Sequence, residues 1–491
     1  MFKYEKLNAS SIVNAPPAER VVEFSPSGLD AGDVARVLTL AVDGRAVSVE
    51  AGEGYAAVSG RANFRLVYQD RDGEAHGVDY NADFDLRVEG GFAPEDSVTA
   101  EVCIIEADVR TGEGVVLSAL VGVKAQAVRR TEEECLTDAE KCYKTVEDVT
   151  LPVLVAAKTV STSVEEDMDA GDIDSVLLSD VQAVVTSAVA GEGKITVEGR
   201  VRAAVTFVEN GEMTQRESVI PFVEEVAADG VQEGDLATAS ASVRNSRIVL
   251  QGVPGANVIR FEGDVALRVQ AVRLEKREIV ADMFMLTNEV ELSREARKFL
   301  YPAGVKYSSE SVSGTASLEG RGGAERIVAL PYARCHVAKA EVTDTGALVE
   351  GVLVADVIYR GEDGIGSVRA EVPYSLDVEG KFGADVSAVC FVEKIKAKAG
   401  RGELHIEAEV GVLVSSVGCC EAEYVSSVTV GEEKERNDSA LSLYIVAEGD
   451  EMWDVCKALT ATPDDIMAQN PSLTLPLSPG DRVVYFRTLA G

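Results

Sequence analysis

Two short segments of this sequence come close to motifs that bind phosphate or metal. Gly191-Glu192-Gly193-Lys194 has the glycines and lysine of a phosphate-binding loop, but Ile195 stands where the Ser or Thr that reaches magnesium belongs. Asp167-Met168-Asp169-Ala170-Gly171 has the acidic spacing of a calcium loop, but its glycine comes one position early, and Leu178 occupies the place of the bidentate acid. We therefore expect a hairpin turn at the first segment and an acidic surface loop at the second.

The histidines and cysteines do not combine into a recognisable site. His76, His336 and His405 fall in a hairpin or in strands of separate segments, and no two have the spacing of metal ligands. The eight cysteines are scattered, with no pair of C-x-x-C motifs, so we expect buried, reduced thiols. No G-x-S-x-G elbow offers a nucleophile. The sequence therefore predicts no catalytic residues, no metal and no cofactor, and we expect the protein not to be an enzyme.

The charge of the chain limits its partners. There are 47 Lys and Arg residues against 83 Asp and Glu residues, a net charge of -36. Such a surface repels nucleic acid and anionic membrane, because phosphate binding needs clustered Lys and Arg. A charged partner should therefore present a basic face. The richest apolar stretch, Gly114 to Val123, ends far short of the ~18 residues of a membrane span. We expect no membrane insertion and, without a signal-peptide pattern, a cytoplasmic location.

The elements that would position any site are repeated along the chain. The segment that begins Ala31-Gly32-Asp33 recurs as Ala170-Gly171-Asp172, and a glycine, Gly60 or Gly199, follows 27 residues after each aspartate. A third copy is centred on Gly351. Apolar residues alternate with others on both sides of each glycine, over residues 58–68, 197–207 and 349–359. Because side chains alternate faces along a strand, this pattern places one face of each strand on a core.

Each of these strands leads into a hairpin. The turn pairs are Asp72-Gly73, Asn210-Gly211 and Asp363-Gly364, and the return strands carry the aromatic residues Phe84, Phe222 and Tyr374. In the third copy Val352, Val354 and Ile358 are apolar on the other face as well, which predicts burial on both sides. The glycine inside each strand predicts a bulge or a close approach of two backbones, and not a ligand site.

A different pattern begins near residue 442. A short strand, Leu443 to Val446, precedes a helix near Glu451 to Leu459. Thr462-Pro463-Asp464-Asp465 predicts a second helix start, with a capping hydroxyl, a proline at the first position and acids in the first turn. That helix should end near Asn470-Pro471 and lead to a strand over Arg482 to Phe486.

The predicted fold class is mainly β, with three repeated β-rich domains followed by a small βααβ domain. We expect the domains near residues 1–130, 131–280 and 281–430, a polar linker at 431–441, and the small domain at 442–491. Helix is expected in the β-rich domains only at Thr131 to Val146 and at Ser293 to Tyr301.

The small domain resembles the LysM family. The residues that carry the resemblance are Tyr444-Ile445-Val446, Gly449-Asp450, Trp453, Ile466, Asn470-Pro471 and Leu477-Ser478-Pro479-Gly480. LysM domains usually bind N-acetylglucosamine polymers in a shallow groove. The resemblance implies a partner- or glycan-binding groove at Gly449, Asp450, Glu451, Met452, Trp453, Asn470, Pro471 and Leu477. Trp453 is expected to be mainly a core packing residue. Glu451 stands where the family often has Thr or Ser, which favours a protein partner over a glycan.

The three β-rich domains resemble the SPOCS domain of spore-coat and endospore-associated proteins. The Gly-Asp-Ile/Val segment and the strand with its central glycine and hairpin turn carry this resemblance. It implies a morphogenetic role in spore-envelope assembly, in the mother-cell cytosol at the forespore surface. The implied partner is the basement-layer ATPase of the coat, joined through the LysM-like domain. The runner-up is a peptidoglycan-binding protein, and an enzyme hidden in the β-rich domains is the third hypothesis.

Overall fold

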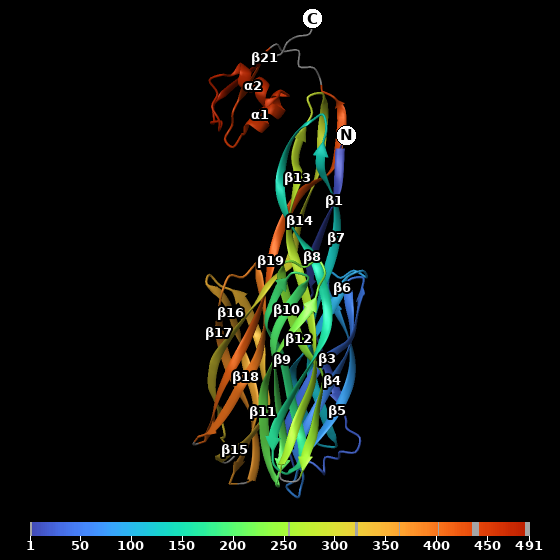
Figure 1. Ribbon diagram of the computed structural model, residues 1–491, viewed down its shortest axis with the longest axis vertical. Helices are drawn as coiled ribbons and strands as arrows, with labels where there is room; N and C mark the ends of the chain where they lie inside the picture. The colour runs from blue at the N-terminus through green and yellow to red at the C-terminus, as the bar shows by residue number, and fades with distance from the viewer. Residues whose placement is uncertain are drawn as a thin grey trace.

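The computed structural model describes residues 2–253, 256–319, 323–362, 364–400, 402–434 and 441–486. The described chain is almost entirely antiparallel β-structure, with two short helices near its C-terminal end. Figure 1 shows an elongated molecule in which three β-sandwiches lie at one end, a stalk of long strands rises from them, and a small C-terminal module lies at the far tip of the stalk.

Each sandwich contains one sheet of three strands that are consecutive in sequence, and these three sheets repeat one topology. The middle strand of each pairs with both neighbours. The strands of the three sheets are β3 (Arg36–Gly52), β4 (Tyr55–Gln69) and β5 (Ala75–Glu89); β9 (Ile173–Gly191), β10 (Lys194–Glu209) and β11 (Glu212–Ala227); and β15 (Ala324–Val342), β16 (Gly346–Gly361) and β17 (Gly364–Glu379).

The second sheet of each sandwich is built on the last strand of its copy, which pairs with the first strand and with the strand before it. In the first copy the first strand is divided in two. The strands are β1 (Phe2–Asn14), β2 (Ala18–Phe24), β6 (Ser97–Thr111) and β7 (Val115–Ala139); β8 (Tyr143–Ala170), β12 (Leu236–Val253) and β13 (Ala256–Phe284); and β14 (Asn288–Ser317), β18 (Asp385–Ala399) and β19 (Glu403–Glu433).

The glycine in the middle strand of each copy lies directly opposite an aromatic residue. The three pairs are Gly60 with Phe84, Gly199 with Phe222, and Gly351 with Tyr374. The ring covers the glycine so closely that an added Cβ would lie 2.2 Å from Cζ of Phe84 or Phe222, and 2.5 Å from the hydroxyl oxygen of Tyr374. The aromatic ring therefore occupies the space that a side chain would need.

A β-bulge lies beside each of these glycines, on the neighbouring strand. The extra residues are Val47, Thr186 and Ala338, each 13 positions before the glycine of its copy. Added Cβ atoms at Gly199 and Gly351 would also lie 2.5 and 2.1 Å from backbone oxygens of the bulged strands. The predicted bulge and close approach are both confirmed, and their identical spacing shows that the three copies share one local design.

The first and last strands of each copy continue beyond the sandwich as a two-stranded ribbon. Three ribbons pack together into the stalk, whose core takes side chains from all six strands. These core residues are Leu7, Ala9, Cys135, Val149, Leu151, Ile279, Phe299, Ala422 and Tyr424. Fully burying a large apolar side chain contributes about 1.5–3 kcal/mol, so this shared core ties the three copies together.

Both helix predictions are wrong, because the two segments form strands of the stalk. Thr131 to Val146 lies in the ends of β7 and β8 and the turn between them, and Ser293 to Tyr301 lies within β14. Both segments are rich in residues that favour helices, but pairing along the ribbons and burial of one face outweigh that local preference. The expected divisions at 130, 280 and 430 fall within β7, β13 and β19; the chain passes between copies in turns at 140–142 and 285–287.

Three smaller predictions can be compared with the structure. Gly191 to Lys194 forms the predicted hairpin turn, with Gly193 at a φ of +69°. The prediction of an acidic surface loop is wrong, because Asp167 to Ala170 form the end of strand β8. There Arg260 binds the Asp167 carboxylate. Residues 431–433 of the expected linker continue β19, and 435–440 lie outside the described residues, as does Asp363 of the third turn pair.

The thiols are only partly as expected. Cys135 and Cys456 are buried, whereas Cys103 and Cys419 are exposed. Within the part of the chain that the structure describes, no helix has the length and apolar character needed to cross a membrane.

Candidate functional site: the C-terminal module and its seat on the stalk

The C-terminal module has the strand and helix order that its sequence predicts. It contains β20 (Leu441–Ile445), α1 (Met452–Leu459), α2 (Pro463–Gln469) and β21 (Arg482–Phe486), and β20 pairs antiparallel with β21. The second helix begins as expected, because the Thr462 hydroxyl accepts a hydrogen bond from the Asp465 amide at 3.0 Å. A small core closes the module. This core also includes Phe284 of β13.

The first loop of the predicted groove is fixed by the carboxylate of Asp450. Its Oδ2 accepts hydrogen bonds from the Ala447 amide and the Tyr444 hydroxyl, both at 2.8 Å. These two bonds hold the pKa of Asp450 below its ordinary value. Gly449 has a φ of +91°, in the left-handed region that favours glycine. The strand therefore turns sharply into α1 and presents Gly449 and Glu451 to solvent.

The second loop of the predicted groove is anchored by the side chain of Asn470. Its amide nitrogen donates to the backbone oxygens of Ile466 and Val484, at 2.8 and 2.7 Å, and its oxygen accepts from the Val484 amide at 2.9 Å. Asn470 is 8% exposed. Its amide thus positions the loop, while the adjacent Pro471 is exposed.

The structure brings the two loops together along one side of the module. The backbone of Val446 bonds to both Gly480 and Asp481, at 2.8 and 3.0 Å, which joins the segment before Gly449 to the segment after Leu477. Met452, Trp453 and Leu477 are partly buried against the module core. The predicted residues thus divide into exposed positions, which can contact a ligand, and partly buried positions, which support them.

Trp453 makes a contact that the sequence did not predict. Its indole Nε1 donates a hydrogen bond to Oδ2 of Asp282 in the stalk at 2.7 Å, and Lys457 binds the same oxygen at 2.7 Å. The Trp453 and Phe284 rings pack in a T-shaped arrangement, with ring centroids 5.0 Å apart, and Phe284 stacks on Tyr143. Trp453 is therefore more than a core residue of the module, because it also seats the module on the stalk tip.

The electrostatics of this seat favour a charged Asp282. Burial alone would raise the pKa of this carboxyl, but the hydrogen bonds from Lys457 and Trp453 hold it below its ordinary value. Arg294 of β14 lies 3.2 Å from the other oxygen. An open hollow of about 430 Å³ lies beside the seat, with Lys434 also in its lining. The mixed charges of this lining fit a structural junction better than a site for one charged ligand.

The seat could have been suspected from one sequence signal. Asp282-Met283-Phe284-Met285-Leu286 ends the second copy with large apolar side chains around a single acid. Such a run at the end of a copy predicts a covered surface. The position of its partner, about 170 residues later, required the tertiary structure.

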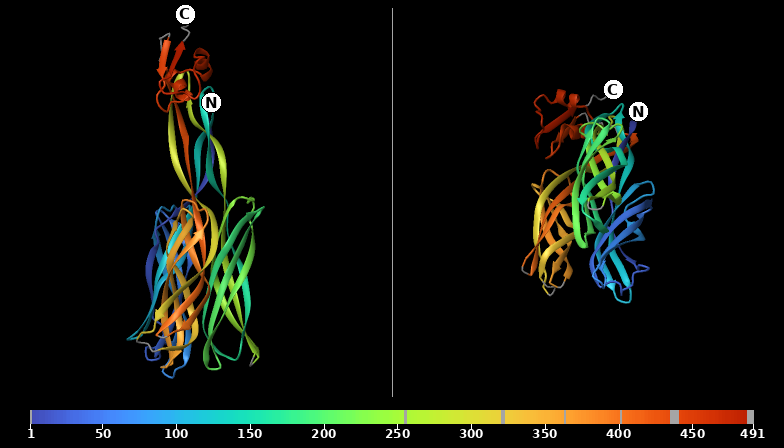
Figure 2. Two further views of the ribbon diagram at one scale, coloured as in Figure 1. Left: turned by 90° about the vertical axis from the view of Figure 1, so that its left-hand side faces the viewer. Right: turned by 60° about the horizontal axis from the view of Figure 1, so that its bottom comes forward.

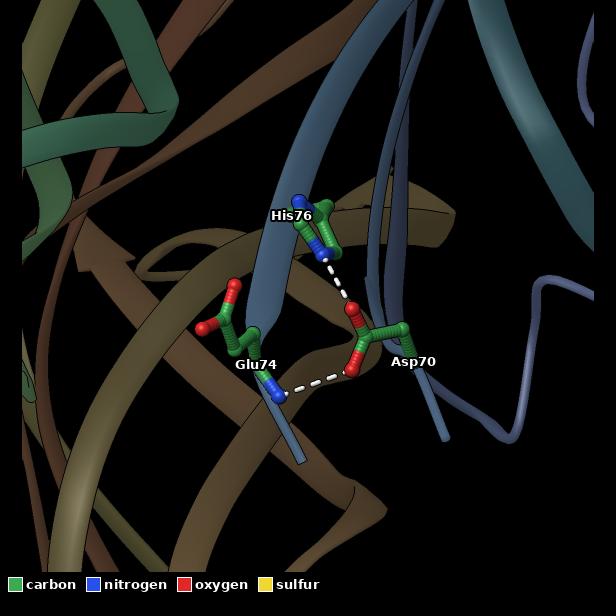
Figure 3. A group of neighbouring side chains, drawn as sticks. All are labelled: Asp70, Glu74 and His76. Atoms are coloured by element: carbon green, nitrogen blue, oxygen red, sulfur yellow. Dashed lines mark hydrogen bonds and ion pairs between the residues drawn. The ribbon is translucent and has the colours of Figure 1, made fainter. Parts of the chain in front are cut away.

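One further cluster has the residue types of a metal site. Asp70, Glu74 and His76 lie at the β4–β5 hairpin, with one potential ligand atom of each within 4.8 Å of the others (Figure 3). Asp70 Oδ2 is 2.7 Å from His76 Nε2, and its Oδ1 accepts from the amides of Asp72 and Glu74 at 3.0 and 2.9 Å. Both oxygens of Asp70 are thus already engaged, and the arrangement braces the hairpin.

The fold and the module together define a protein of three covalently linked β-sandwich repeats with a small C-terminal βααβ module. A family comparison then names one repeat: residues 172–250 match the family described as "SipL, SPOCS domain". The match begins at Asp172 and covers β9, β10, β11 and most of β12, so the second copy contains a SPOCS domain. No match was found among curated proteins or among solved structures.

Proposed function

We propose that this chain is a non-catalytic adaptor in spore-coat assembly and that it resembles SipL, the sporulation stage IV protein A interacting protein L, over its length. The observation that carries the proposal is the SPOCS domain at residues 172–250. The copies on either side repeat its glycine, the aromatic residue directly opposite that glycine, and the bulge 13 positions before it. Three such copies with a terminal LysM-like module form an architecture suited to assembly and not to catalysis.

The proposed partner is the basement-layer ATPase of the coat, and the module is the proposed contact. The module is acidic: from Leu443 to Gly491 there are three basic residues against seven acidic ones. Glu451 is exposed where glycan-binding relatives often carry a hydroxyl. A carboxylate at the groove favours Lys and Arg on a partner protein, since complementary charge speeds association and selects the partner.

The stalk supports an adaptor role. It carries the module away from the three sandwiches (Figure 2, left), so that a partner can reach the groove loops without contacting the sandwiches. The seat formed by Trp453, Lys457 and Asp282 fixes the module on the tip. The proposed place of action is the mother-cell cytosol at the forespore surface.

The alternative function is binding of peptidoglycan or other N-acetylglucosamine polymers through the same groove. A direct test titrates the purified full chain with the purified coat ATPase and, separately, with a chito-oligosaccharide. We expect saturable binding of the ATPase and no saturable binding of the saccharide. Tight saccharide binding without ATPase binding would replace the adaptor proposal by the glycan proposal.

The variant for this test is Glu451→Ser, which removes the exposed carboxylate at the groove. Glu421→Ser, on strand β19, is the control because it makes the same charge change outside the module. We expect the groove variant to bind the ATPase about threefold to tenfold more weakly and the control to bind as the wild type does. Equal weakening by both variants would indicate a non-specific charge effect.

A further inference from the structure

The three copies contact one another in a closed cycle. Each copy uses an equivalent residue for this contact: Gly77, Gln215 or Ser367. Each of these residues lies on the return strand, opposite the residue seven positions after the glycine of the middle strand. At Gly77 the backbone of the first copy approaches Leu177 of the second, so that an added Cβ would lie 2.0 Å from the Leu177 oxygen. Gln215 of the second copy exchanges two hydrogen bonds with the Leu330 backbone of the third, at 2.6 and 3.0 Å.

The cycle is completed by the third copy. The Ser367 hydroxyl donates to the backbone oxygen of Val37 in the first copy at 3.3 Å. In the tilted view of Figure 2 the three copies lie beside one another in a triangle. Leu38, Leu177 and Ala329, each 22 positions before the glycine of its copy, are buried in one shared cluster at the centre. The chain is thus built like a cyclic trimer whose subunits have been joined end to end.

Ion pairs between the copies lie at the centre of this ring, and we call the group of Arg334, Asp43 and Asp180 the lock. Arg334 of the third copy binds Asp43 of the first at 2.9 Å and Asp180 of the second at 2.5 Å. Arg65 also binds Asp43, at 2.6 Å, and Arg202 also binds Asp180, at 3.1 Å. Asp180 and Arg202 are almost completely buried. Burial alone would raise the pKa of Asp43, but the two arginines hold it below its ordinary value.

The position that Asp43 and Arg334 share holds a different residue in each copy. Asp43, Gln182 and Arg334 each lie 17 positions before the glycine of their copy. A ring of three third copies would bring three arginines together at this place, and a ring of three first copies would bring three aspartates together. Like charges this close disfavour such rings, whereas Arg334 placed between Asp43 and Asp180 is compatible with the order found here.

We propose that the lock of Arg334 with Asp43 and Asp180 specifies one intramolecular order of the three copies and thereby prevents them from pairing with copies of a second chain. Each copy offers one face to the next, so an opened ring would expose two complementary faces that fit a second copy of this chain. A buried ion pair often contributes little to stability compared with apolar packing, and specificity is its best-supported role.

The test uses the full chain with Arg334→Asp, which places a third acid beside Asp43 and Asp180. Arg260→Asp is the control, because Arg260 forms a more exposed pair with Asp167 inside the second copy. After refolding from denaturant, the masses are measured by light scattering on a sizing column. We expect the Arg334 variant to give dimers and larger species whose share increases with concentration. Its thermal unfolding midpoint should be lower than that of the wild type by roughly 5 °C or more. The control and the wild type should remain single chains.

A second measurement leaves Arg334, Asp43 and Asp180 unchanged. Protease sites are placed in the turns at 140–142 and 285–287 of the otherwise wild-type chain, and the folded protein is cut. We expect the three pieces to stay together as one particle with one copy of each. Separation of the pieces in native buffer would overturn the proposal, as would an Arg334 variant that refolds entirely as single chains.

Discussion

The indole nitrogen of Trp453 lies 2.7 Å from Oδ2 of Asp282, across the junction between the C-terminal module and the stalk. Trp453 is the only tryptophan of the chain, so its fluorescence reports on this one junction. The contact links Trp453, in the first turn of α1, to the last strand of the second copy.

Asp282→Ala should loosen this seat. The variant loses the acceptor shared by Trp453 and Lys457, and hydrogen bonds to charged groups contribute about 1.5–3 kcal/mol. We expect tryptophan emission to shift to longer wavelength and acrylamide quenching to increase, while far-ultraviolet circular dichroism stays unchanged. Asp167→Ala, which breaks an ion pair in the second sandwich, is the control. Unchanged quenching in the Asp282 variant would contradict the seat.

Gly199→Ala should destabilise the second copy. The new methyl group would meet the ring of Phe222 and the backbone oxygen of Val184, at 2.2 and 2.5 Å before any adjustment. Overpacking of this kind costs about 1–3 kcal/mol, which denaturant unfolding can measure. Gly112→Ala is the control, because no atom lies within 4 Å of the added Cβ. Equal stability of the two variants would show that the aromatic cover has no energetic role.

Stability should fall in acid partly through Asp96 and Asp235, two carboxylates held in the same way in the first and second copies. Arg129 and Arg273 bind them in bidentate fashion at 2.6–2.9 Å. The hydrogen bond from Arg129 lowers the pKa of Asp96. Burial opposes the effect at Asp235, but its pKa is lowered too by Arg273 and the Gln232 amide.

The sign of the pH dependence follows from these lowered values. The stabilisation is present above the ordinary Asp value of about 3.9 and is lost as pH falls through the lower values of the folded state. Asp96→Asn with Asp235→Asn should therefore reduce the free energy of unfolding at pH 7, and its difference from the wild type should shrink below about pH 4. The exposed Asp229→Asn serves as the control. A difference that stays constant with pH would contradict this assignment.

Binding of the proposed partner should weaken with salt. The acidic module attracts a basic surface, and exposed charges are screened over about 10 Å at 0.1 M ionic strength. We expect the association rate with the coat ATPase to fall severalfold between 50 and 500 mM NaCl, as measured by surface plasmon resonance, with a smaller effect on dissociation. A rate independent of salt would argue against a charge-guided contact.

The strands and hairpins of the sandwiches could be predicted because their local signals agree with the fold. Period-two alternation, turn pairs and the repeated glycine all point to the same structure around Gly60, Gly199 and Gly351. The burial of both faces predicted for the third copy is confirmed at Ile358, which is completely buried, whereas Val352 and Val354 are only partly buried. Burial of the second face was not predicted in the other two copies because charged residues such as Arg65 and Arg202 lie on it. Arg202 is buried and forms ion pairs with Asp180 and Glu217.

The stalk and the seat could not be predicted for a different reason. Ser293 to Tyr301 favours a helix locally, and only pairing with β19, more than 100 residues away, makes it a strand. The groove residues came from resemblance to a family, whereas Asp282 and Phe284 have no role in that family pattern. Contacts between distant segments, such as Trp453 with Asp282, follow from packing and are not written in local spacing.

The central claim is that this chain acts in spore-envelope assembly, and its location during sporulation tests that claim most directly. A fluorescent fusion of the full chain is imaged in sporulating cells, beside a chain that ends at Lys434 and so lacks the module. We predict that the full chain forms a shell around the forespore inside the mother cell and that the shortened chain spreads through the mother-cell cytosol. A full chain that stays diffuse throughout sporulation, or that collects at the outer cell wall, would contradict the account.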